Sequence, residues 1–257
     1  MMPDSRIGLE IDSRVAVVTL DRAEKRNALD AAMIEGLAAA CRTIEHHAAV
    51  RVVILTGAGN RAFSAGGDIQ AWSDKAPDDF GRFWLREGHD AFAAVARLRQ
   101  PVIAVLNGDV FGGGLELAAC ADLRIAEQHV RIALPETGLG IIPGWSGTQR
   151  ASRRFGAQLV RRMALFGEVF DADVALRLGI VDHIVESGAG IVAARQIAAQ
   201  VCGRAPLATE LTKMLVNAAE GEETERVLEA IAGIAAARSE DLQEGLAAFR
   251  DKRPARF

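Results

Sequence analysis

The segment PVIAVLNGDVFGGGLELAACADLRIA, residues 101–126, decides the expected fold because it passes from strand to helix and back to strand. Val102–Leu106 form a continuous apolar run that is typical of a buried strand. A glycine-rich turn follows, and the small residues of 113–121 are interpreted as a helix. A second strand is expected over residues 122–126. This order of elements predicts an α/β fold.

Strand and helix patterns continue on both sides of this segment. Upstream, two β-branched runs joined by a turn predict a hairpin, and Asp30 is placed to cap a long helix whose apolar residues recur at helical spacing. Downstream of about residue 145 the pattern is mostly helical. The expected strands are 7–11, 15–20, 52–55, 102–106, 122–126, 130–134 and 180–185. Besides the helix capped by Asp30, the expected helices are 80–98, 113–121, 147–154, 157–166, 173–178, 192–201 and 207–249, the last with breaks near Gly221 and Ser239.

The change in pattern predicts two regions, a mixed α/β core over residues 1–200 and a helical region over residues 201–257. Alanine-rich faces such as residues 230–237 permit close approach of another helix. The sequence leaves open whether that helix belongs to a neighbouring subunit or to the same chain.

Length and composition restrict the class of protein. A chain of 257 residues fits one large domain, and 50% hydrophobic with 25% charged residues is close to the average of soluble globular proteins. The sequence has no uncharged apolar run of about 18 residues, and its N-terminus has no apolar segment typical of a signal peptide. A net charge of −4 gives no electrostatic reason to expect nucleic acid as a partner. We therefore expect a cytoplasmic protein.

The cysteines do not suggest a metal site. Cys41, Cys120 and Cys202 are widely spaced, form no CxxC pair and have no histidine near them at ligand spacing. We interpret them as small, buried residues and expect no bound metal.

Two glycine-rich segments could present backbone donors to a ligand. In AFSAGGDI, residues 62–69, adjacent glycines let a ligand approach the main chain, so the N–H of Gly67 could donate to an anion. In residues 107–120 three glycines precede a helix, and the N–H of Gly113 would lie at the positive end of the helix dipole. The alternative is that the glycine triplet only allows close helix packing.

Two isolated glutamates are the candidate proton-transfer groups. Glu116 is the only charged residue in residues 110–121, and Glu136 is the only one in residues 132–149. A carboxyl group in apolar surroundings has a raised pKa, and two such groups in one pocket can divide acid and base roles. For Glu116 the alternative is a buried ion pair with an arginine such as Arg124.

Together, these features suit chemistry beside a thioester carbonyl. Two backbone donors would stabilise an enolate oxygen, and two carboxyl groups would handle a water and a carbon-bound proton. The sequence contains neither a phosphate-binding P-loop nor a GxSxG nucleophile motif, so nucleotide hydrolysis and serine hydrolysis are not indicated.

The same motifs resemble the crotonase family, the enoyl-CoA hydratase/isomerase superfamily. The resemblance runs through LDRAEKRNAL (20–29), AFSAGGDI (62–69), residues 101–126, ALPETGLGIIPGWSGTQR (133–150) and FRDKR (249–253). It implies a spiral of ββα units with a C-terminal helical trimerisation region, assembled as homo-trimers or homo-hexamers. It also implies an acyl-CoA substrate and no separate cofactor, because coenzyme A is part of the substrate.

The resemblance implies roles for five residues at the reaction centre. The N–H groups of Gly67 and Gly113 form an oxyanion hole for the thioester carbonyl. Glu116 acts mainly as base on a water molecule, and Glu136 delivers the proton to the α-carbon during hydration. The N–H of Gly144 helps to hold that water.

Coenzyme A is expected along residues 22–29 and beside the backbone of Ala65. In relatives a basic residue of the C-terminal tail reaches the 3′-phosphate, and Lys252 matches it. The implied substrate-binding residues are Arg22, Lys25, Ala28, Ala65, Asp68, Ile69 and Lys252.

Two departures from the family pattern concern the acyl group. Gly67 stands where alanine is common, which leaves more room at the carbonyl. Trp145 stands where a small residue is usual, and it either narrows the acyl pocket or packs outward. Trp72 and Trp84 fall in the variable region that often lines the acyl site.

The leading hypothesis is a 2-enoyl-CoA hydratase, a carbon–oxygen lyase, because both glutamates are present and hydration needs both. The alternatives are a double-bond isomerase, which manages with one acid/base residue, or another acyl-CoA-transforming member of the superfamily. An RNA-binding member or a scaffold without catalysis is a further alternative. The net charge counts against the first of these and the two intact glutamates against the second.

Overall fold

The structure, a computed structural model, describes residues 6–257 and divides into two compact units, Met1–Glu210 and Leu211–Phe257. The division lies inside helix α10 (Pro206–Ala219). The division expected from the sequence, at residue 201, lies inside the preceding helix, α9 (Gly190–Cys202).

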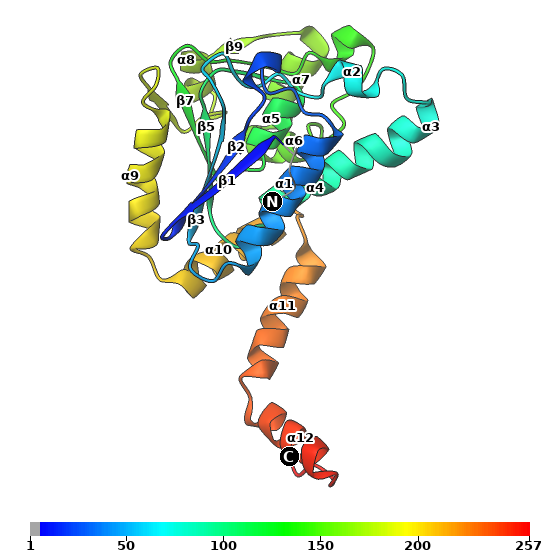
Figure 1. Ribbon diagram of the computed structural model, residues 1–257, viewed down its shortest axis with the longest axis vertical. Helices are drawn as coiled ribbons and strands as arrows, with labels where there is room; N and C mark the ends of the chain where they lie inside the picture. Colours follow the sequence, from blue (N-terminus) through cyan, green and yellow to red (C-terminus); the bar gives the residue numbers. More distant parts are fainter. Residues whose placement is uncertain (1–5) are drawn as a thin grey trace. The chain divides into compact units, whose positions relative to one another are not determined.

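A six-stranded sheet forms the centre of the first unit, with strands in the order β1 (Ile7–Asp12), β2 (Val15–Leu20), β3 (Val52–Gly57), β5 (Val102–Leu106), β7 (Leu123–Glu127) and β10 (His183–Val185) (Figure 1). β1 and β2 form the antiparallel hairpin that the sequence predicts, and the other pairs are parallel. Strands β3 and β5 are buried along their full length, which explains their continuous apolar sequence.

A smaller sheet has the order β4 (Ala62–Ser64), β6 (Asp109–Phe111), β8 (Arg131–Ala133) and β9 (Phe170–Asp171). The first three are parallel, and β9 joins β8 antiparallel. Each parallel strand directly follows one of the large sheet: β4 follows β3, β6 follows β5 and β8 follows β7. These strand pairs, followed by helical segments, give the ββα spiral that the resemblance implies. Strands β4, β6 and β9 are not among the strands predicted from the sequence, because two or three residues are too few to show a period.

Helices cover both faces of the large sheet (Figure 1). On one face lies α1 (Ala31–His46), whose N-cap Asp30 accepts a hydrogen bond from Met33 N at 2.9 Å, as the sequence predicts. It packs against β1, β2 and helix α4 (Arg86–Ala96). On the other face α9 packs against β3, β5 and β7. Alternate residues of β3 therefore enter two separate apolar cores.

The remaining helices of the first unit are short: η1 (Ala23–Lys25), α2 (Ile69–Trp72), α3 (Pro77–Asp79), the π-helical η2 (Phe80–Leu85), α5 (Gly113–Ala118), η3 (Glu136–Leu139), α6 (Arg150–Phe155), α7 (Ala157–Phe166) and α8 (Ala172–Arg177). The second unit comprises most of α10 with α11 (Thr224–Ala237) and α12 (Glu240–Asp251). Among residues 6–257, no helix is both long and apolar enough to span a membrane.

Candidate active site

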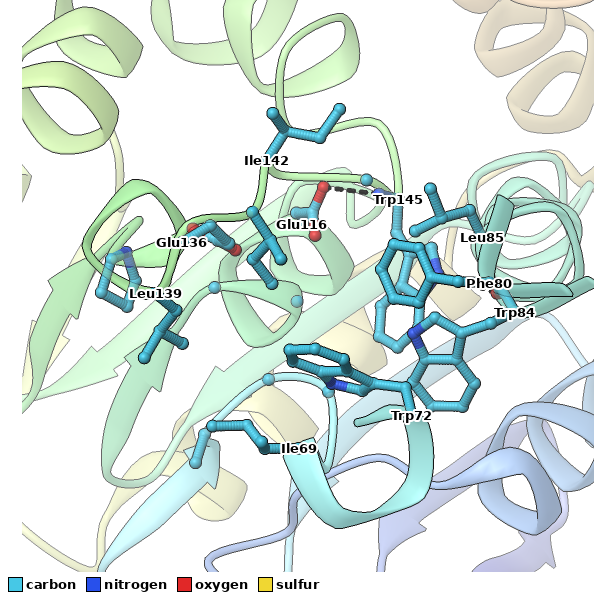
Figure 2. A pocket seen from close by; sticks show the side chains of 18 residues that line it. Ile69, Trp72, Phe80, Trp84, Leu85, Glu116, Glu136, Leu139, Ile142 and Trp145 are labelled. Carbon is cyan, nitrogen blue, oxygen red and sulfur yellow. Dashed lines mark hydrogen bonds between the residues drawn. The ribbon is translucent and has the colours of Figure 1, made fainter. Parts of the chain in front are cut away.

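A cavity of about 90 Å³ lies where the glycine-rich loops of the first unit meet (Figure 2). The short strands β4, β6 and β8 lead into these loops, so the smaller sheet positions them. The lining residues are Ala65, Gly66, Gly67, Ile69, Trp72, Phe80, Trp84, Leu85, Gly112, Gly113, Glu116, Pro135, Glu136, Leu139, Ile141, Ile142, Gly144 and Trp145.

The peptide N–H of Gly67, a residue that lines this cavity, faces away from the neighbouring Leu29. Leu29 pairs with Gly67 in a parallel bridge, in which Leu29 N donates to Gly66 O at 2.8 Å and Asp68 N donates to Leu29 O at 2.8 Å. In such a bridge the polar groups of the middle residue face away from the partner strand. Within residues 6–257, the N–H of Gly67 donates to no protein acceptor.

The N–H of Gly113 lies close to the same loop. Gly113 is the first residue of α5, and within the described chain its N–H also donates to no protein acceptor. A Cβ atom on Gly66 would lie 2.9 Å from Phe111 O and 3.0 Å from Gly113 N. Gly66 also has φ +94°, a conformation that glycine adopts without strain. The close contact of the two loops therefore requires glycine and brings both donors to one cavity.

Glu116 is held on α5 by the loop that follows η3. Its side chain is buried, and Oε1 accepts hydrogen bonds from Trp145 N at 2.8 Å and Gly147 N at 2.6 Å. Burial raises the pKa of Glu116 to about 8, and the nearby charge of Glu136 acts in the same direction. The two N–H groups and the positive charge of Arg150 lower the pKa of Glu116 and offset part of that increase.

The arginine near Glu116 is not the one that the sequence suggested. Arg124 donates to Ile180 O at 2.7 Å and pairs with Asp182 at 3.0 Å, so it belongs to another cluster. The cation that acts on Glu116 is Arg150, which is only 2% exposed on α6. The sequence carried a signal for Arg150, because it is the first charge after the uncharged stretch that follows Glu136.

Glu136 is buried at the start of η3, and burial raises its pKa to about 7. A Cβ atom on Gly112 would lie 2.7 Å from Glu136 Oε1, so glycine at position 112 leaves room for the carboxyl group. Within the described residues, Oε2 is buried without a hydrogen-bond partner. Such an atom gains free energy when a ligand or water supplies a donor.

The arrangement supports proton transfer beside a stabilised anion. Two carboxyl groups with pKa values raised toward neutrality can hold one proton between them. They share a cavity with two N–H groups that have no protein acceptor. Among residues 6–257, no cluster of three or more histidine, cysteine, aspartate or glutamate side chains could hold a metal ion.

Comparison with known proteins identifies the family. Residues 10–257 match the family model described as enoyl-CoA hydratase/isomerase. The chain belongs to the enoyl-CoA hydratase/isomerase family. This confirms the resemblance and the expectation of an enoyl-CoA hydratase-type enzyme.

Individual relatives of this family member cover most of its length. It is 38% identical to a short-chain-enoyl-CoA hydratase of Clostridium acetobutylicum over 81% of this chain and 80% of that protein. It is 33% identical to a crotonyl-CoA hydratase of Syntrophomonas wolfei over 100% of this chain and 99% of that protein. A solved enoyl-CoA hydratase from Bacillus anthracis has a TM-score of 0.80 and 31% identity, covering 98% of each chain. These similarities confirm the predicted α/β fold of the crotonase type.

Two of the expected coenzyme A residues of this enoyl-CoA hydratase/isomerase family member bind each other. Arg22 Nη1 contacts Asp68 Oδ2 at 2.6 Å and donates to Ala28 O at 2.9 Å. Asp68 also caps α2 by accepting from Gln70 N at 3.0 Å. Both side chains thereby join the 22–30 loop to the Gly67 loop.

The other expected substrate residues are dispersed. Ala65 and Ile69 line the cavity, whereas Lys25 and Ala28 lie in the neighbouring loop outside its lining. Lys252 lies in the second unit, just after α12. The assignment of these residues to coenzyme A stays a prediction.

One buried residue of the Arg22 loop was not among the residues predicted from the sequence. Asn27 is fully buried, and its Nδ2 donates to Ala58 O at 3.0 Å and Ala62 O at 2.8 Å. Its Oδ1 accepts from Arg22 N at 3.0 Å. Asn27 thus connects the loop to β4, a role that the motif RNAL did not reveal.

All three tryptophans of this family member line the cavity (Figure 2). Trp145 and Trp84 are buried, with ring centroids 5.1 Å apart. Of the two alternatives for Trp145, the structure selects the inward one. Gly144, the expected water-binding residue, also lines the cavity.

Proposed function

We propose that the protein catalyses the reversible syn-hydration of a 2-enoyl-CoA thioester to a 3-hydroxyacyl-CoA. The observation that carries the proposal is the pair of buried carboxyl groups, Glu116 and Glu136, in one cavity with the N–H groups of Gly67 and Gly113. The relatives named short-chain-enoyl-CoA hydratase and crotonyl-CoA hydratase support the same reaction class.

In the proposed mechanism the thioester oxygen accepts hydrogen bonds from Gly67 N and Gly113 N, which stabilise the negative charge of the enolate. Water oxygen forms a bond to C3 while a carboxylate takes one of its protons. The other carboxyl group gives its proton to C2. The atoms balance, because one water is added across the double bond and the pair of glutamates regains its starting protonation after one proton exchange.

The hydrogen bonds favour Glu116 as base and Glu136 as acid. Two N–H groups bind Glu116 Oε1 and stabilise its ionised form, whereas Glu136 Oε2 has no donor among the described residues. Burial raises the pKa of Glu116 above that of Glu136, and this difference in pKa favours the opposite assignment, with Glu116 as acid. The proposed assignment therefore rests on the hydrogen bonds, with the N–H of Gly144 as a further donor to the water.

The test is hydration of crotonyl-CoA by the purified protein, followed by loss of the absorbance of the conjugated thioester. We expect Glu116→Gln and Glu136→Gln each to lower turnover by about 10²–10⁴-fold, the usual contribution of a general acid or base. Glu127→Gln is the matched control, because Glu127 is a buried glutamate outside the cavity that accepts from Gly190 N. Near wild-type turnover in either cavity variant would refute its assigned role.

The double-bond isomerase is the alternative within the family. It needs one group to move a proton between two carbons, so the second buried carboxyl group counts against it. Conversion of a 3-enoyl-CoA by a protein that leaves crotonyl-CoA unchanged would favour the isomerase.

A further inference from the structure

The enclosed end of the cavity is made of indole rings. Trp84 and Trp145 are 4% and 3% exposed, and Trp72 packs beside Phe80 with centroids 5.5 Å apart. Figure 2 places these rings together on one side of the cavity, with Glu136 on the other. The three tryptophans, here called the indole wall, come from α2, η2 and the loop before α6.

The indole wall meets the cavity at the proposed oxyanion donor. A Cβ atom on Gly67 would lie 3.3 Å from Trp145 Cη2, 3.4 Å from Trp84 Cζ2 and 3.6 Å from Trp72 Nε1. All three rings therefore converge on the backbone of Gly67. An acyl chain whose carbonyl binds there lies against the wall from its first carbons.

Trp145 fills space that a longer chain would need. Its ring packs edge-on against Phe92 with centroids 5.1 Å apart, and its Nε1 donates to Trp84 O at 3.3 Å, so its position is fixed. A Cβ atom on Gly113 would lie 2.8 Å from Trp145 Cε3, and one on Gly88 would overlap the indole. The indole ring therefore fills the space between α4 and α5, so this space is not available to the acyl chain.

The cavity has one closed and one open end. Its other boundary includes Ile69, Leu139 and Ile142, which are 46%, 55% and 65% exposed. The volume of about 90 Å³ is well below the roughly 300–1,000 Å³ of sites for drug-sized ligands. The cavity is therefore too small to hold coenzyme A, which must extend out through the open end, and the acyl tail faces the indole wall.

We propose that the indole wall, and Trp145 above all, restricts the substrate to thioesters with a short acyl group of crotonyl size. This inference rests on the proposed function for the carbonyl position. It assigns to Trp145 the selection of acyl length, separate from the acid/base chemistry of the two glutamates.

Acyl-chain selection is tested first by binding, which needs no turnover. The dissociation constants of butyryl-CoA and octanoyl-CoA are measured by calorimetry for the wild type, Trp145→Phe and Trp145→Ala. Each additional methylene that becomes buried increases affinity about fourfold. We expect the wild type to bind octanoyl-CoA no more tightly than butyryl-CoA, and Trp145→Ala to increase the octanoyl-to-butyryl affinity ratio at least tenfold, with Trp145→Phe between them.

The second measurement is the ratio of kcat/KM for 2-octenoyl-CoA to that for crotonyl-CoA in the same variants. The ratio is independent of the fraction of folded enzyme, and Phe155→Ala is the control, because Phe155 is a buried aromatic residue outside the cavity lining. A wild type that prefers octanoyl-CoA in binding, or a ratio unchanged in Trp145→Ala, overturns the inference while crotonyl-CoA hydration still stands. Short-chain preference in binding without any hydration overturns the proposed function and leaves the indole wall supported.

Discussion

The backbone N–H of Trp145 donates to Glu116 Oε1 at 2.8 Å, while the indole of the same residue lines the cavity. One residue thus contacts a proposed catalytic carboxyl group through its main chain and the proposed acyl site through its side chain. Replacing the side chain leaves the main-chain donor in place. The two functions can therefore be changed separately by mutation.

The first prediction concerns the pH dependence of hydration. The proposed reaction needs one ionised and one protonated carboxyl group, and the pair has pKa values of about 7 and about 8. We expect kcat/KM for crotonyl-CoA to be greatest between pH 7 and 8 and to fall by up to tenfold per pH unit on either side. A profile that is flat from pH 5.5 to 9.5 would show that these groups do not carry the protons.

The second prediction concerns stability. Because the folded pKa of Glu136 is raised from 4.5 to about 7, ionisation costs the folded state free energy as pH rises from about 4.5 to 7. Glu136→Gln removes that cost, at most about 3 kcal/mol by the size of the shift. We expect Glu136→Gln to have a higher Tm than the wild type at pH 8 and a similar Tm at pH 4. Glu87→Gln, on an exposed part of α4, is the control and should show no such difference.

The third prediction concerns the fit between Trp145 and Gly88. A Cβ atom on Gly88 would overlap Nε1 and Cε2 of the indole. We expect Gly88→Ala to lower the free energy of unfolding by about 1–3 kcal/mol, as overpacking usually does. In a Trp145→Phe background the cost should be smaller, since phenylalanine lacks the pyrrole ring.

Gly81→Ala is the control for the Gly88 cycle. Gly81 lies in η2, where an added Cβ meets no atom within 4 Å. Urea unfolding of the four members of the cycle gives the coupling energy directly. Equal costs of Gly88→Ala in both backgrounds would show that the indole does not sit where the structure has it.

The fourth prediction concerns Arg150. Its positive charge lowers the pKa of Glu116, so Arg150→Met should raise that pKa further. Because Glu116 has the higher pKa of the pair, we expect the alkaline limb of the kcat/KM profile to move to higher pH in Arg150→Met and much less in Arg150→Lys, which keeps the charge. If that limb is unshifted in a folded Arg150→Met variant, the charge of Arg150 does not affect the ionisation that limits kcat/KM.

The fifth prediction concerns assembly. Helices α11 and α12 expose large apolar side chains, among them Leu228, Leu246 and Phe249. Such surface is usually covered in an oligomer. We expect homo-trimers or homo-hexamers in light scattering at micromolar concentration, and lower mass for Leu246→Glu. A monomeric wild type would contradict the assembly.

Sequence patterns predicted the parts of the fold that depend on local periodicity. The hairpin of β1 and β2, the buried strands β3 and β5 and the cap at Asp30 all follow from spacing and residue type. Both glutamates could be selected because each is a single charge in a long uncharged stretch.

Features that depend on distant contacts could not be predicted in this way. Strands β4 and β6 have three residues each and exist through pairing with one another. The inward direction of Trp145 depends on Gly88, which lies on another element. Arg150, rather than Arg124, lowers the pKa of Glu116 because of how α6 packs, and this packing cannot be predicted from the order of the residues.

Four main-chain N–H groups belong to the proposed reaction centre: those of Gly67 and Gly113, two residues that line the cavity, and those of Trp145 and Gly147, which bind Glu116. Main-chain donors persist through most substitutions, so natural drift at position 145 leaves the Glu116 contact intact. A substitution at position 145 that keeps the fold would therefore change the proposed acyl selectivity while the main-chain hydrogen bond to Glu116 persists. The main chain thus fixes the proposed reaction centre, while the side chain at position 145 can change which acyl groups are accepted.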